Sequence, residues 1–164
     1  ASIAHTDGLQ RTAAKLEVLA RANPIDFQAA IGLAEAYQHL KQPEAANRTL
    51  DQIVRDPQAH ANAVLEAAQQ YAALTNYAGL ETALGRLTNL SPNRPEVWYD
   101  LAALKAALSK TAEAIPALRR ALELSDQRLK QDPKAQDLRA QVAQDPRFAT
   151  LRQSPEFRQL TAPR

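Results

Sequence analysis

Residues 64–87 read VLEAAQQYAALTNYAGLETALGRL, and this stretch is the middle one of three similar stretches. Shifted by 34 positions it aligns with AIGLAEAYQHLKQPEAANRTLDQI at 30–53 and with WYDLAALKAALSKTAEAIPALRRA at 98–121. Five apolar columns keep this step through all three copies: Leu33/Ala67/Leu101, Ala34/Ala68/Ala102, Ala46/Leu80/Ala114, Leu50/Leu84/Leu118 and Ile53/Leu87/Ala121. A fixed period of this length in independent columns is the signature of a repeat protein.

Each copy divides into two amphipathic helices with a short break between them. In the first copy Leu33, Ala34 and Tyr37 recur at helical spacing before the break at 41–43. The other breaks fall at 75–76 and 109–110, and the first two copies close at Asp56-Pro57 and Ser91-Pro92. Because one hairpin cannot bury its apolar face alone, the sequence predicts an all-α solenoid of about three stacked helix hairpins.

This pattern resembles the tetratricopeptide repeat (TPR), a 34-residue helix–turn–helix. The resemblance covers residues 24–126 and divides them into TPR 1 (24–57), TPR 2 (58–92) and TPR 3 (93–126). The third copy carries most of the pattern: Trp98, Leu101, Ala102, Ala114, Leu118 and Ala121. Alanine replaces the family's small glycine in every copy. Asp126 stands where the closing proline belongs, which predicts a helix that continues past Leu124.

The two ends depart from the repeat. Residues 1–23 are predicted to form an N-terminal helix, either a cap or a partial repeat, because Leu16 and Leu19 lie one period before Leu50 and Ile53. Residues 127–164 are predicted to hold a capping helix at 134–144 and two short helices that begin with proline, each with a Phe and a Leu three residues apart. We expect these short helices to pack on the last hairpins. An arm that docks on another molecule is the alternative.

The composition argues against several classes of chemistry. The chain has no cysteine and 4 glycines, so it has no thiolate site and no Gly-rich phosphate loop. His5, His39 and His60 do not pair with one another or with carboxylates at metal-ligand spacing. We therefore expect no enzyme, no cofactor and no metal. No apolar run approaches the ~20 residues that a membrane span needs, and the sequence does not indicate a compartment.

Charge is unevenly distributed along the chain. Residues 1–118 carry 10 Lys/Arg and 12 Asp/Glu, whereas residues 119–164 carry 10 and 6. The basic series in this tail is interrupted by acids and has no interleaved aromatic residues, so nucleic-acid binding is not expected. A solvated surface is the favoured interpretation, with an acidic neighbour as the alternative.

The resemblance implies a binding surface, because the first helices of TPR hairpins line a concave face that accepts extended peptides. By position, the inward residues are Gln28, Ile31, Glu35, Gln38, Asn62, Leu65, Gln69, Tyr99, Ala103 and Ala106. The family's Lys/Asn clamp for a C-terminal carboxylate is absent, since its places hold Ile31, Glu35, Leu65 and Gln69. The expected function is a protein-interaction or scaffold module with a neutral, amide-rich groove for a peptide or partner segment.

Two alternatives stay open at this stage. The chain could be a structural accessory domain of a larger bacterial protein or enzyme. That larger protein could be anchored in a membrane, and the basic tail of this chain would then position the domain. It could also self-associate through its N-terminal helix, if that helix leaves Leu16 and Leu19 available.

Overall fold

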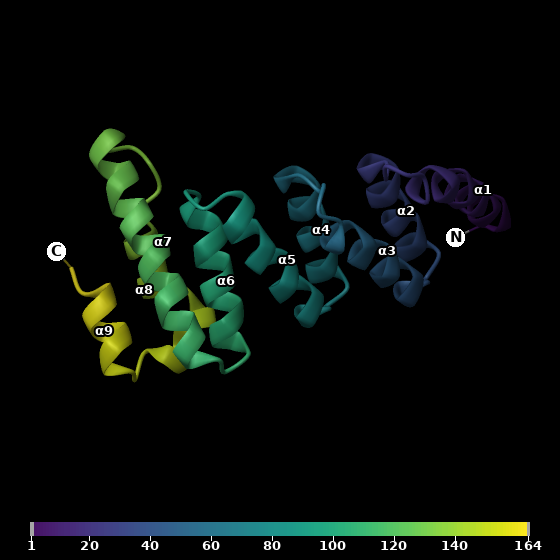
Figure 1. Ribbon diagram of the computed structural model, residues 1–164. Helices are drawn as coiled ribbons and strands as arrows, with labels where there is room; N and C mark the ends of the chain where they lie inside the picture. The colour runs from purple at the N-terminus through teal and green to yellow at the C-terminus, as the bar shows by residue number, and fades with distance from the viewer. Residues whose placement is uncertain (1, 164) are drawn as a thin grey trace. The chain divides into compact units, whose positions relative to one another are not determined.

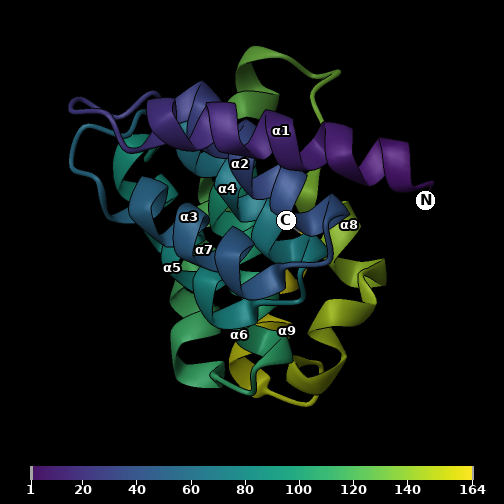
Figure 2. The same ribbon diagram turned by 90° about the vertical axis from the view of Figure 1, so that its right-hand side faces the viewer.

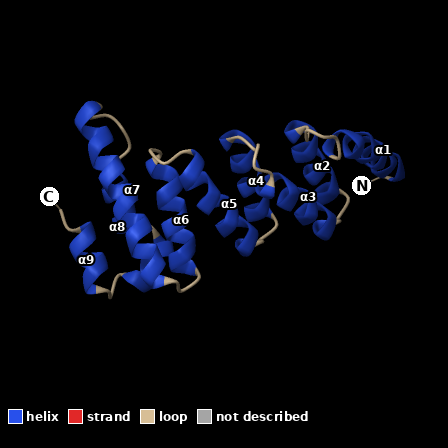
Figure 3. Cartoon of the chain, viewed as in Figure 1, coloured by secondary structure: helices blue, strands red, loops and turns tan. Residues whose placement is uncertain are grey.

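A computed structural model describes residues 2–163, which fold into α-helices and one 3-10 helix with no β-strand among them (Figure 3). The chain divides into two compact units, the first ending at Leu90 and the second beginning at Ser91. In chain order the helices are α1 (Ile3–Ala20), α2 (Phe27–His39), α3 (Pro43–Arg55), α4 (Ala61–Ala73), α5 (Tyr77–Leu90), α6 (Pro95–Ala107), α7 (Thr111–Gln131), α8 (Leu138–Gln144), η1 (Pro146–Leu151) and α9 (Pro155–Thr161) (Figure 1). The predicted all-α array of helix hairpins is confirmed.

The first unit holds two hairpins and the N-terminal helix. α2 pairs with α3 and α4 pairs with α5, while α2 and α3 pack against α4. α1 packs against α2 and lies across it in Figure 2. The alanine columns lie where the helices approach each other, since Ala34 and Ala46 are fully buried. Leu50, Ile53 and Leu87 fill the space between the helices and are also fully buried. At about 25 cal/mol per Å² of buried apolar surface, this packing is the main force that holds the hairpins together.

The first helix of every hairpin ends in the same way. Lys41, Thr75 and Ser109, which are 34 positions apart, each have a φ between 54° and 60° in the left-handed region. In each case the next amide bonds back five residues, at 2.8 Å from Gln42 N to Tyr37 O in the first hairpin. This Schellman arrangement satisfies carbonyls that the helix end leaves free, although glycine is the usual residue at the left-handed position. The repeat therefore extends from the apolar columns to the backbone of the turns.

The second unit is one hairpin with the C-terminal segments folded back on it. α6 pairs with α7, η1 lies against α6, and α8 and α9 pack on α7. The core contains Tyr99, Leu118, Leu122, Phe148 and Phe157, all at most 4% exposed. The predicted packing of the short Pro-initiated segments on the last hairpin is therefore seen within this unit.

One helix continues where the sequence predicted that it would, and one begins later than predicted. α7 runs past Leu124 to Gln131, so the boundary of TPR 3 at 126 falls inside this helix. The capping helix begins at Leu138 instead of 134, because the side chain of Asp137 accepts hydrogen bonds from the amides of Arg139 and Ala140 and caps the helix there. A capping carboxylate of this kind fixes where a helix starts.

Candidate protein-interaction surfaces

A hollow of about 380 Å³ lies between α2 and α4 of the first unit. Four of the predicted inward residues line it, namely Ile31, Glu35, Gln38 and Gln69. His39, Glu66, Gln70 and Ala73 complete the lining. The other predicted residues of this unit are not among the lining residues: Gln28 and Asn62 are exposed near the starts of α2 and α4, and Leu65 is half-buried on α4.

Two hydrogen bonds fix the floor of this hollow. The side-chain amide of Gln38 donates to Oε1 of Gln70 at 2.6 Å, and the amide of Gln70 donates to the carbonyl oxygen of Ile31 at 3.1 Å. Because these bonds join α2 to α4, the two walls are held at a set separation. The sequence positions did not single out Gln70, although it is adjacent to the predicted Gln69.

The hollow is acidic, which corrects the prediction of a neutral groove. Glu35 and Glu66 contribute two carboxylates, and no Lys or Arg lines the walls. His39 Nε2 lies 3.9 Å from Oε1 of Glu35, and both of these side chains are exposed. Glu66 is half-buried and has no hydrogen-bond or ion-pair partner within residues 2–163. Negative charge in this hollow is therefore left without a fixed counter-charge.

The three predicted inward residues of α6 are covered, which corrects the expectation that they face a partner. Tyr99 is 2% exposed, and Ala103 and Ala106 are fully buried. The side chain of Phe148 in η1 meets the Tyr99 ring edge-on, with the ring centroids 5.3 Å apart. Thr150 adds a 3.4 Å hydrogen bond from its hydroxyl to the carbonyl of Ala106. The C-terminal segment occupies the face that was expected to be open.

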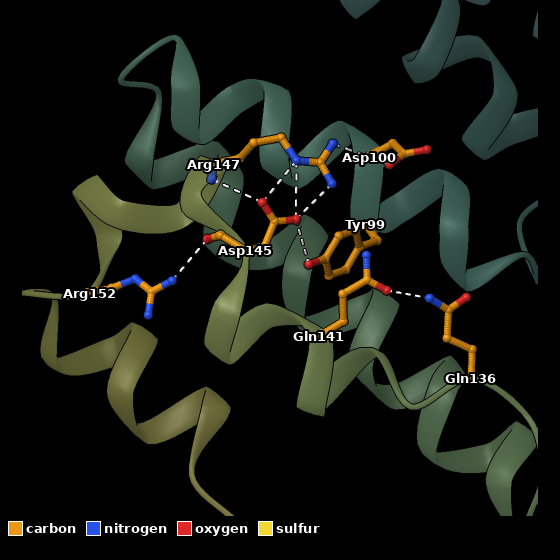
Figure 4. Close-up of polar contacts among 7 residues, drawn as sticks. All are labelled: Tyr99, Asp100, Gln136, Gln141, Asp145, Arg147 and Arg152. Atoms are coloured by element: carbon orange, nitrogen blue, oxygen red, sulfur yellow. Dashed lines mark hydrogen bonds and ion pairs between the residues drawn. The ribbon is translucent and has the colours of Figure 1, made fainter.

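A polar network fastens this segment to α6 (Figure 4). The Tyr99 hydroxyl donates to Oδ2 of Asp145 at 2.8 Å, and Nη2 of Arg147 donates to the same oxygen at 2.7 Å. The guanidinium of Arg147 lies 5.7 Å from the centre of the Tyr99 ring and 3.6 Å from a carboxylate oxygen of Asp100. Arg152 donates to the carbonyls of Ala143 and Asp145 at 2.6 and 3.0 Å. Cation–π contact and charge-assisted hydrogen bonds both strengthen the docking.

The network shifts the ionisation of its carboxylates in opposite directions. Hydrogen bonds from Arg147 lower the pKa of Asp145 to about 2. Burial raises the pKa of Asp100, which the nearby Arg147 offsets only in part. Burial together with the hydrogen bond to Asp145 raises the pKa of Tyr99. The hydrogen bonds from Arg147 therefore favour the ionised form of Asp145 in the folded second unit.

Several arginines of the basic tail are paired with carboxylates. Arg128 donates two hydrogen bonds to Glu96, one of them 2.9 Å long, and these lower the pKa of Glu96. Arg139 donates to Asp126 at 2.9 Å. These pairs leave fewer unpaired cations on the second unit than a count of its Lys and Arg residues suggests.

The N-terminal helix is less available for self-association than the sequence suggested. Leu16 is half-buried against α2, so close that a Cβ added to Gly32 would lie 3.4 Å from its Cδ1. Leu19 is half-exposed, and Ile3 and Val18 are more exposed.

The histidines are scattered. His39 lines the hollow, whereas His60 caps α4 by accepting a 3.2 Å hydrogen bond from the Ala63 amide. The part of the chain that the structure describes has no group of three His, Asp or Glu residues that could hold a metal ion. No described helix has the length and apolarity to cross a bilayer.

Comparison with solved structures finds a likeness in fold. A solved structure of MamA (AMB-1, crystal form P212121) matches 96% of this chain and 85% of its own, with a TM-score of 0.52 and 18% sequence identity. It shares the fold. No protein-family profile matches the chain, and no curated protein matches its sequence. At this level of identity the likeness to MamA extends to the helical-repeat fold and no further.

Proposed function

We propose that this protein is a protein-interaction module and that its first unit binds an extended segment of a partner in the hollow between α2 and α4. The observation that carries the proposal is that two pairs of repeat-equivalent residues on the first helices, Glu35 with Gln69 and His39 with Ala73, line one open hollow. Ile31 and Gln38 on α2 add to the same lining. TPR-like hairpins are expected to bind with this face, and in the second unit it is covered by η1.

The chemistry of the hollow suits an extended segment better than a folded surface. The glutamine side chains can both donate to and accept from a peptide backbone. Ile31 and Ala73 add apolar surface beside them. Because Gln38 and Gln70 already lock the walls, binding would cost little reorganisation of the protein. A segment that lies along α2 and α4 would gain affinity from hydrogen bonds with the glutamine side-chain amides. Its apolar contacts would distinguish one partner sequence from another.

The test begins with a phage-displayed library of 12-residue peptides selected on the full chain. The selected peptides are then titrated against two variants that introduce the same side chain at different places. Ala73→Tyr fills the hollow from its rim, where Ala73 is exposed. Ala112→Tyr places the same ring at an exposed position on α7 of the second unit.

We expect Ala73→Tyr to weaken peptide binding at least tenfold and Ala112→Tyr to leave it unchanged. Circular dichroism of both variants checks that the helical content is preserved. The proposal is overturned if the library yields no binding peptide, or if Ala73→Tyr binds the selected peptides as tightly as the wild-type protein does.

A further inference from the structure

The second unit contains a bound example of a short segment on the inner face of a first helix. Asp145 starts the segment by accepting a hydrogen bond from the Arg147 amide at 3.0 Å, and η1 then lies along α6. Two adjacent residues of the segment contact two adjacent residues of the helix. Arg147 faces Asp100, and Phe148 faces Tyr99.

The 34-residue period places equivalent residues on α4. Leu65 of α4 corresponds to Tyr99, and Glu66 corresponds to Asp100. An apolar residue followed by a carboxylate is therefore repeated at the same place on the first helix of both hairpins. In the second unit the carboxylate has an arginine partner. In the first unit Glu66 has no partner among the described residues.

The residues around Glu66 also favour the binding of a cation. Glu66 lines the same hollow as Glu35, and no Lys or Arg is among the lining residues. Two carboxylates beside one hollow repel each other, and an arginine that enters it relieves this repulsion while donating charge-assisted hydrogen bonds. The planar guanidinium also suits a carboxylate better than an ammonium group does.

From this equivalence we infer that the partner segment contains an arginine next to an apolar residue. The arginine enters the hollow and pairs with Glu66, and the apolar side chain packs against Leu65, which is half-buried on α4 beside the hollow and outside its lining. The inference rests on the proposed function of the hollow. The partner differs from residues 145–151 at one point. Leu65 has no hydroxyl to match Tyr99, so the partner needs no counterpart of Asp145. Gln69 replaces Ala103 and offers the partner backbone a side-chain amide.

The experiment is a double-mutant cycle on a library-selected peptide, read by fluorescence anisotropy. One arm replaces the peptide's arginine by citrulline, which keeps the shape and removes the charge. The other arm is Glu66→Gln, with Glu44→Gln as the matched control because Glu44 is exposed on α3 and does not line the hollow. The citrulline arm uses the wild-type protein, so it does not depend on the folding of a variant.

We expect the selected sequences to be enriched in arginine followed by an apolar residue. Citrulline and Glu66→Gln should each weaken binding about tenfold, and the two together should weaken it little more than either alone, because they remove the same pair. Glu44→Gln should change affinity less than twofold. A higher salt concentration should weaken binding of the arginine peptide more than binding of the citrulline peptide.

Three results would contradict the inference. If no peptide is selected, the proposed function fails and the inference fails with it. If peptides bind but lack arginine, or if the two changes are additive, the hollow binds segments without the Glu66 pair and only the inference is overturned. If the peptide DPRFATLR of residues 145–152 binds the full chain as tightly as any selected peptide, a second copy of this chain is the occupant and the assignment to a separate partner is wrong.

Discussion

The hydroxyl of Tyr99 on α6 donates a 2.8 Å hydrogen bond to the carboxylate of Asp145, 46 positions later in the chain. The other oxygen of this carboxylate accepts a hydrogen bond from the Arg147 amide at 3.0 Å and so caps η1. One side chain therefore starts the 3-10 helix and also attaches it to the third hairpin. This relationship helps to explain why the inner face of α6 is buried within the second unit.

Phe148 should contribute more to the stability of the second unit than any polar contact of the network. It is fully buried against Tyr99 and Phe157, so Phe148→Ala should cost about 3–5 kcal/mol. Tyr99→Phe keeps the ring and loses one hydrogen bond, which should cost about 1 kcal/mol. The single tryptophan, Trp98, lies in α6, so its fluorescence during urea unfolding reports this unit. An unchanged midpoint for Phe148→Ala would show that η1 is not part of the core.

The stability of the second unit should fall on acidification below pH 4. The pKa of Asp145 is about 2 in the folded protein, against about 3.9 in an unfolded chain. A lowered pKa stabilises the fold fully above the unfolded value, and this contribution is lost as the pH falls toward 2. Asp145→Asn should be less stable at pH 7 and should lose less stability between pH 4 and 2 than the wild type. Equal losses in the two proteins, measured by Trp98 fluorescence, would exclude Asp145 as the source.

Two glycines of α5 should respond oppositely to alanine. A Cβ on Gly79 would fall well inside van der Waals contact with the ring of Tyr71, which is 1% exposed and hydrogen-bonded to Asp51. Gly79→Ala should therefore cost about 1–3 kcal/mol. A Cβ on Gly85 meets nothing within 4 Å, so Gly85→Ala should gain about 0.5–1 kcal/mol from helix propensity. Urea unfolding followed by circular dichroism compares the two, and a stabilising Gly79→Ala would contradict the packing described for Tyr71.

Thr75→Gly should stabilise the first unit. Thr75 has a φ of 54°, a conformation that is unfavourable for a β-branched residue and accessible to glycine. We expect a gain of about 0.5–1 kcal/mol, reduced by the greater freedom of glycine in the unfolded chain. Thr82→Gly is the control, because Thr82 lies inside α5 and its replacement should lose a few tenths of a kcal/mol. A loss at both positions would argue against the left-handed turn at Thr75.

The repeat itself could be predicted from the sequence because it appears as a regular spacing of apolar residues along the chain. Columns such as Ala34 and Leu50 recur with a fixed step, and the breaks in the pattern fall at the turns that contain Lys41, Thr75 and Ser109. Local patterns of this kind determine which residues form helices and which of their faces are buried. The Phe148 and Leu151 pair likewise indicated a packed segment.

The candidate site was harder to predict because it depends on long-range packing. Nothing in residues 145–151 specifies that they lie against Tyr99, because a short apolar pair can pack on any exposed face. The positions taken from the TPR resemblance included Leu65 and Gln69 as inward residues. They did not include the neighbouring Glu66 and Gln70, which line the hollow together with Gln69. Helix direction and the tilt between α2 and α4 decide which neighbour reaches the hollow, and neither is encoded in a 34-residue period.

Binding in the hollow is tested most directly by ¹⁵N-HSQC spectra of the full chain during titration with a library-selected peptide. We predict that amide signals of Ile31, Gln38, Gln69 and Gln70 shift with peptide concentration, while those of Tyr99, Ala103 and Phe148 stay in place because η1 remains on α6. Shifts concentrated at Tyr99, Ala103 and Phe148, with Ile31 and Gln69 unchanged, would contradict this. They would mean that a partner displaces the C-terminal segment and that the binding surface is on the second unit.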